Sequence, residues 1–196
     1  MGDPYLTVRR EGWFPRALEI SANLDAAVQM QTDAEEIWEV AAKTEDENGL
    51  RRADRMSQEA ARVQAKNSKY VQAWLTETER KSSRKTRELW SSARDGLLMQ
   101  SAGLLLELMV WERRLLFRNP SSQQNLCALS GQGIEHALYG ARLIAAMKAR
   151  ETESVVHEIA GEAHGRLKSM MDERQYLLTH YRVAQSRWLA WANPQP

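Results

Sequence analysis

The sequence has few of the residues that break helices or mark a chemical site. Its single cysteine, Cys127, excludes an internal disulfide and a zinc site built from paired cysteines, and it fits a reducing compartment. Only five prolines and ten glycines occur in 196 residues. Residues with high helix propensity, such as Ala, Leu, Glu, Lys and Arg, are plentiful, whereas β-branched residues are sparse. This composition favours helix almost throughout the chain.

The sequence also lacks a recognisable targeting or membrane segment. Residues 1–5 are polar, which argues against a signal peptide, and Leu6 stands where an N-myristoylation motif needs Ser or Thr. The most hydrophobic stretch, residues 96–111, is too short to span a bilayer. We therefore expect a cytoplasmic protein with no membrane span, and we expect residues 96–111 to form a helix buried on most sides.

Charge is nearly balanced overall but unevenly distributed along the chain. The net charge of +1 argues against a general polyanion binder. Residues 33–47 hold seven acidic residues and one lysine, whereas residues 51–87 hold eleven basic and four acidic residues. Such segregation can guide helix pairing, or it can present a basic face to a partner.

The most informative pattern is an apolar seam near the C-terminus. Its positions are separated by alternating steps of four and three residues, which average 3.5, the period of a helix packed along one narrow stripe. A seam of this length spans roughly 50 Å. The seam consists of Val156, Ala160, Ala163, Leu167, Met170, Arg174, Leu177, Tyr181, Ala184, Trp188 and Trp191.

Similar spacing elsewhere predicts an all-α fold, an elongated bundle of four to five long helices with coiled-coil-like antiparallel packing. The expected helices cover about residues 15–44, 50–80, 86–118, 134–150 and 153–192 of one domain, 15–192. Residues 1–14 are expected to form an irregular arm anchored by Trp13 and Phe14, and residues 193–196 a tail. Neither Gly nor Pro separates the last two helices, so a turn near 150–153 and one continuous helix both fit.

Three local features refine this expectation. Asn48-Gly49 is a turn signal, which predicts that the first two helices form an antiparallel hairpin. Gln31 and Asn67 fall on the apolar stripes, where a polar residue can set the register. Gly96 and Gly103 lie seven residues apart on one helix face, where another backbone can approach closely.

A basic run is the sharpest candidate for a binding site. Residues 76–88 contain no apolar side chain, so they form either a flexible break or a solvent-exposed continuation of the helix, and we favour a helix that leaves the bundle surface. On such a helix the basic side chains form a stripe that can follow phosphates, and the flanking Trp74 and Trp90 can stack on bases. The alternative is a solvated face with Glu77–Lys81 as an ordinary ion pair and both tryptophans in the packing stripes. The run comprises Arg80, Lys81, Arg84, Lys85 and Arg87.

Motifs for catalysis or cofactor binding are missing from the sequence. His157 and His164 share a helix face, but positions seven apart are about 10 Å apart, too far to bind one metal ion unaided. Gly131-Gln132-Gly133 lacks the third glycine of a dinucleotide site, and Ser130 lies in no nucleophile elbow. We therefore expect no enzyme activity, no cofactor, no metal and no small-molecule substrate.

The resulting functional hypothesis is a non-catalytic helical interaction subunit, which packs with itself or with protein partners in a larger assembly. Tyr181, Trp188 and Trp191 are the preferred anchors for a partner, because aromatic side chains dominate interface energetics; the alternative is that they fill the end of the internal core. Gly161 and Gly165 either allow a close helix crossing, with another subunit as one option, or simply weaken the helix locally. The alternative hypothesis is an accessory subunit that contacts nucleic-acid phosphates through the basic run.

Overall fold

The computed structural model describes residues 4–116, 131–149, 155–156, 158–162 and 165–166. These residues form helices joined by turns and contain no strand, so the all-helical class is confirmed for this part of the chain. Residues 155–156, 158–162 and 165–166 are also helical. The labelled elements are α1 (Pro4–Glu11), α2 (Phe14–Thr44), α3 (Glu47–Thr78), the 3-10 helix η1 (Glu79–Lys81), α4 (Arg87–Leu116) and α6 (Gln132–Lys148).

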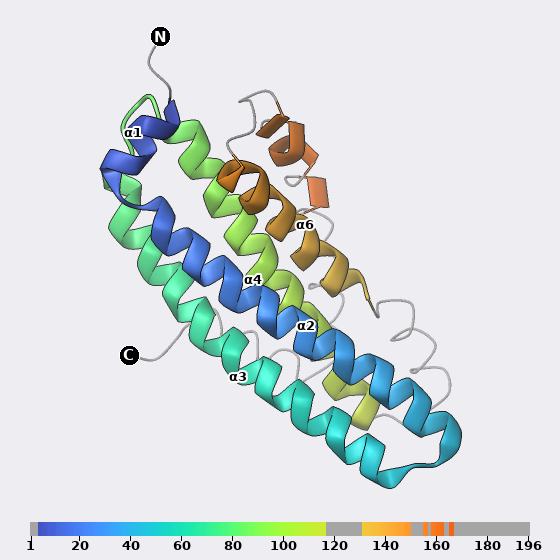
Figure 1. The fold of residues 1–196 in the computed structure, drawn as a ribbon. Coiled ribbons are helices and arrows are strands. Elements are labelled where there is room, and N and C mark those ends of the chain that lie inside the picture. The colour runs from blue at the N-terminus through green and yellow to red at the C-terminus, as the bar shows by residue number, and fades with distance from the viewer. Residues whose placement is uncertain (1–3, 117–130, 150–154, 157, 163–164, 167–196) are drawn as a thin grey trace.

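Helices α2 and α3 lie side by side along most of their length (Figure 1). The two seam amides, Gln31 and Asn67, are buried, as the stripes predicted. Small residues recur on the buried faces at intervals of seven, which returns them to nearly the same side of each helix. At most 2% of each side chain in this set is exposed: Ala27, Ala34 and Ala41 in α2, and Ala53 and Ala60 in α3. Because alanine is small, this spacing lets the two backbones approach closely.

The connection between α2 and α3 is shorter than the sequence predicted. Glu45 adopts a left-handed conformation with φ 55°, and the Asp46 side chain accepts a 3.0 Å hydrogen bond from the Asn48 amide. Asp46 therefore caps α3, and Asn48-Gly49 lies in the first helical turn, so the prediction of a turn at Asn48-Gly49 is wrong. Gly49 instead permits close packing, since a Cβ there would lie 2.7 Å from the Cβ of Ala41.

Helix α4 forms the centre of the fold. It packs against α2, α3 and α6, and every residue from 103 to 111 is buried, which confirms the expectation for the most hydrophobic stretch. Ser101 of α4 is hydrogen-bonded across the core: the Gln64 amide donates to the Ser101 carbonyl at 3.1 Å, and the Ser68 and Ser101 hydroxyls lie 2.8 Å apart. These bonds fix α3 against α4 at the middle of the bundle.

Glycines set the close contact between α4 and α6. A Cβ on Gly103 would lie 2.6 Å from the Gly133 carbonyl oxygen, and a Cβ on Gly96 would lie 3.1 Å from that of Gly140. Gly96 thus faces Gly140 and Gly103 faces Gly133, so the two helices run in opposite directions. The expectation that another backbone approaches Gly96 and Gly103 is confirmed.

A buried carboxylate positions the start of α6. Glu107 of α4 is 0% exposed, and its two carboxylate oxygens lie 3.1 and 3.0 Å from the Gly131 amide nitrogen, which donates to them. Gly131 is the N-cap residue of α6, where the helix dipole favours a negative charge. Gly133 allows this approach, because a Cβ there would lie 2.7 Å from the Glu107 amide nitrogen.

Part of the C-terminal seam can be placed. Val156 is 2% exposed and belongs to the main core, and Ala160 packs against that core. Within the described ranges, every helix is too short or too polar to cross a bilayer. The following predicted positions lie outside the described residues: Tyr181, Trp188, Trp191, His157, His164, the turn near 150–153 and the tail at 193–196.

Candidate functional site

The basic run lies on a turn between α3 and α4. Helix α3 ends at Thr78 and α4 begins at Arg87, so the prediction of a continuous exposed helix across residues 76–88 is wrong. Hydroxyl side chains compete for the backbone here: the Thr78 hydroxyl donates to the Trp74 carbonyl at 2.6 Å, and the Ser82 hydroxyl donates to the Glu79 carbonyl at 2.9 Å. With no apolar face to pack, the helix ends and the chain reverses.

All five predicted basic side chains are exposed on this turn: Arg80, Lys81, Arg84, Lys85 and Arg87. In the described part of the chain, none of the five forms an ion pair, and the Glu77–Lys81 pair is not formed. Arg87 differs, because its guanidinium donates to the carbonyls of Glu79 and Ser82 at 3.2 and 3.4 Å and so helps to close the turn. The five cations therefore gather around a turn rather than along one helix face.

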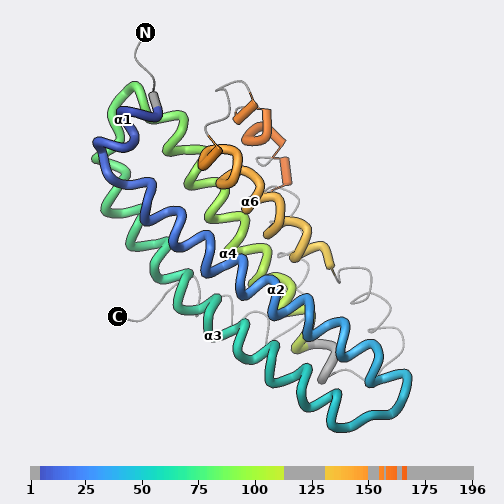
Figure 2. The backbone as a smooth tube through the Cα atoms, viewed as in Figure 1, coloured from blue at the N-terminus to red at the C-terminus, as the bar shows by residue number. Residues whose placement is uncertain are grey.

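The N-terminal segment adds two further cations. Residues 4–11 form α1, so the prediction of an irregular arm is wrong for this segment. Arg9 and Arg10 are exposed in its last turn, and Gly12, with φ 72°, follows the helix. Figure 2 shows α1 beside the turn between α3 and α4. A proline at the start and a glycine after the end are the sequence signals that could have revealed α1.

Glu11 joins α1 to the basic turn. Its carboxylate accepts hydrogen bonds from the Thr86 hydroxyl at 2.5 Å, the Ser83 amide at 3.0 Å and the Trp13 indole at 2.8 Å. Burial alone raises the pKa of the Glu11 carboxyl, but these three donors outweigh burial and hold the pKa below its ordinary value. The carboxylate therefore stays ionised at neutral pH and fixes α1 to the turn.

We define the basic end as Arg9, Arg10, Arg80, Lys81, Arg84, Lys85 and Arg87. Neither the spacing nor the composition of the sequence showed that α1 belongs to it, because the contact joins residues 72 and 75 positions apart. Only the tertiary fold places the two arginines of α1 beside the basic run.

Three buried tryptophans, Trp13, Trp74 and Trp90, pack together in the core next to the basic end. Trp74 and Trp90 stack with ring centroids 5.8 Å apart and planes 11° apart, and Trp13 meets the Trp74 ring edge-on. The indole of Trp74 donates to the Trp13 carbonyl at 2.9 Å. Exposures of 2% for Trp74 and 4% for Trp90 show that neither ring is free to stack on a base. The packing interpretation of these two residues is confirmed, and the base-stacking interpretation is wrong.

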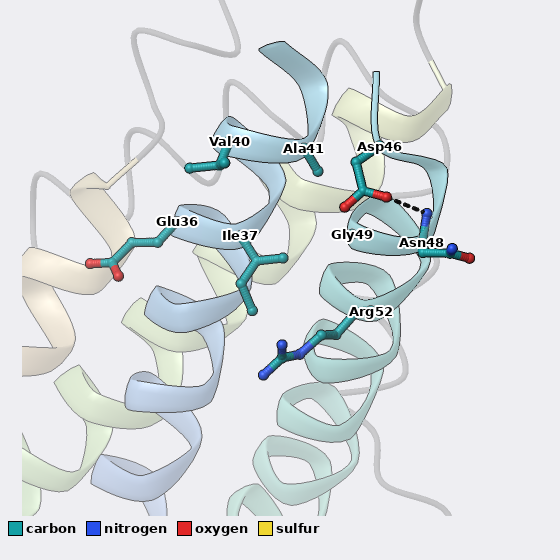
Figure 3. A pocket seen from close by; sticks show the side chains of 8 residues that line it. All are labelled: Glu36, Ile37, Val40, Ala41, Asp46, Asn48, Gly49 and Arg52. Carbon is teal, nitrogen blue, oxygen red and sulfur yellow. Dashed lines mark hydrogen bonds between the residues drawn. The ribbon is translucent and has the colours of Figure 1, made fainter. Parts of the chain in front are cut away.

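The opposite end of the α2–α3 hairpin carries an open, mostly apolar hollow (Figure 3). Its volume is about 520 Å³, and Val40, which is 63% exposed, lies on its rim. No cysteine, serine, threonine or histidine is among the described residues that line it. The residues that line it are Glu36, Ile37, Val40, Ala41, Asp46, Asn48, Gly49 and Arg52.

Other candidate features add no chemical site. Gly161 and Gly165 are exposed, and no other described residue comes within 4 Å of a Cβ built on either, so neither takes part in a close helix crossing within the described ranges. Across the same ranges, His, Cys, Asp and Glu side chains form no group of three suited to a metal ion. No protein-family model, curated protein or solved structure matches this chain.

Proposed function

We propose that this protein is a non-catalytic helical interaction subunit whose basic end binds the phosphate backbone of a nucleic acid. The observation that carries the proposal is the convergence of seven exposed cations from α1 and the α3–α4 turn on one end of the bundle. None of the seven takes part in an ion pair within the described part of the chain. Exposed cations without an ion pair have no such pair to break when they bind a polyanion, and the release of counterions drives the association.

The geometry also indicates the mode of recognition. Arginine and lysine contacts to phosphates position a protein without reading sequence. Base stacking would require exposed aromatic rings, whereas Trp74 and Trp90 are stacked on each other in the core. Binding should therefore depend strongly on salt and weakly on nucleotide sequence.

Replacing all five basic residues of the turn (80, 81, 84, 85 and 87) by glutamine is expected to weaken binding to a labelled DNA duplex at least about tenfold at 50 mM salt. The slope of log K against log salt should fall by about 3 to 5, since each phosphate contact contributes about 0.9. Fluorescence anisotropy across a salt series measures both quantities.

A matched control removes the same charge elsewhere by replacing Lys43, Arg52, Arg55, Lys66 and Lys69, all exposed on α2 and α3, with glutamine. Its affinity should stay much closer to that of the intact protein. Because Arg87 also closes the turn, a fourfold variant that keeps Arg87 separates charge loss from local unfolding. Equal losses in turn and control variants, or no binding by the intact protein at 50 mM salt, would overturn the proposal.

Self-association or protein binding through the C-terminal seam is a second candidate function. Its support is the pair of exposed glycines, Gly161 and Gly165, on a helical segment whose other face packs through Val156 and Ile159. Under this proposal residues 153–192 complete an elongated bundle with coiled-coil-like antiparallel packing, and Tyr181, Trp188 and Trp191 anchor the partner. Light scattering over a concentration series tests self-association. The proposal would be contradicted if the protein stayed monomeric at every concentration and also bound no partner protein.

A further inference from the structure

Helix α1 depends on the rest of the molecule for its position. It has only eight residues, fewer than an isolated helix needs to be stable in water. Its buried contacts are few: Val8 is 2% exposed, and Tyr5 packs against the main core. The orientation of its last turn, which carries Arg9 and Arg10, is therefore sensitive to the bonds that follow it.

Those bonds are concentrated at Glu11. One carboxylate oxygen accepts from the Ser83 amide, and the other accepts from the Thr86 hydroxyl and the Trp13 indole. Two of the three donors belong to the turn that carries the basic run. Glu11 is thus an acidic residue whose hydrogen bonds reach the middle of the basic turn, and these bonds join the end of α1 to that turn.

We infer that Glu11 is a positioning residue that makes Arg9 and Arg10 part of the polyanion-binding surface, so that one phosphodiester backbone contacts α1 and the turn together. This inference rests on the proposed function, since it concerns the same end of the bundle. Under this inference Glu11 promotes binding although its carboxylate carries the same sign of charge as the phosphodiester backbone. It also assigns α1 a role in binding rather than in capping the core alone.

The two possible roles of Glu11 predict effects of opposite sign. If Glu11 acted only through its charge, removing it would strengthen polyanion binding, because a nearby negative charge repels phosphate. If Glu11 acts by holding α1, removing it frees Arg9 and Arg10 from the surface and weakens binding. Glu88 provides the comparison, since it is exposed in the first turn of α4 and no hydrogen bond to its side chain joins it to another described residue.

Glu11→Ala is expected to weaken binding to the DNA duplex about 5- to 10-fold at 50 mM salt and to lower the salt slope by about 1 to 2. Glu88→Ala removes the same charge without freeing α1, so its affinity should equal or slightly exceed that of the intact protein. Replacing Arg9 and Arg10 by glutamine should weaken DNA binding by the otherwise intact protein. The same replacement in the Glu11→Ala variant should cause little further loss of affinity. Thermal unfolding of each variant verifies that the bundle is retained.

Tighter or unchanged binding by Glu11→Ala would overturn the inference, as would fully additive losses for the Glu11 and Arg9/Arg10 substitutions. Those results would leave the proposed function intact if the fivefold turn variant still loses affinity. Failure of the intact protein to bind would instead remove the proposed function and this inference together.

Discussion

Gly140→Ala is expected to destabilise the protein by about 2–3 kcal/mol, although alanine is the better helix former by about 1 kcal/mol. An added Cβ would lie 2.9 Å from the Gln100 amide nitrogen and 2.9 Å from the Met99 Cβ, and it would also clash with the Gly96 carbonyl oxygen. Two of these atoms belong to the α4 backbone, so the clash is relieved only by moving one helix away from the other. Chemical denaturation measures the loss as a lower midpoint.

Gly161→Ala is the matched control. Gly161 is also helical, but it is exposed and has open space around it within the described part of the chain. Here helix propensity acts alone, and the substitution should stabilise the protein by up to about 1 kcal/mol. If both substitutions stabilised the protein, the close contact between α4 and α6 would be refuted.

Trp74→Ala is expected to cost about 3–5 kcal/mol, the range for truncating a buried tryptophan. Trp74 packs against the rings of Trp13 and Trp90, and its indole donates to the Trp13 carbonyl. Its own carbonyl accepts from the Thr78 hydroxyl, which in turn accepts from the Trp90 indole. One truncation therefore opens a cavity where the start of α2 meets α3 and α4, and it leaves the Trp13 carbonyl without its donor.

Trp74→Phe separates these contributions. Phenylalanine keeps much of the aromatic contact but loses the indole donor, so a smaller loss of about 1–2 kcal/mol is expected. Urea denaturation of both variants gives the comparison. A loss below about 1 kcal/mol for Trp74→Ala would show that the three rings do not hold this end of the bundle together.

Helices α2, α3 and α4 were predictable because their apolar residues recur at helical spacing. The contact face of α4 was visible in the seven-residue interval between Gly96 and Gly103, and the same interval separates Gly133 from Gly140 on α6. The sequence could not show that the two glycine pairs meet, since that depends on how the helices are placed in space. The buried Gln31 and Asn67 were likewise visible from their stripe positions.

The errors concern segments whose structure depends on tertiary or polar contacts. The basic turn contains no glycine or proline, so helix propensity alone predicted a helix where serine and threonine hydroxyls bind the backbone. Helix α1 was mistaken for an arm because its support comes from Ser83 and Thr86, far along the chain. The basic run itself was visible, whereas the contribution of Arg9 and Arg10 required the fold.

The most direct test of polyanion binding at the basic end is an NMR titration of isotope-labelled protein with a DNA duplex at low salt. We predict that amide shifts concentrate in residues 4–12 and 78–88 and disappear as salt is raised. Shifts centred on the acidic hairpin end at residues 33–52, or no shifts at saturating DNA, would contradict the account.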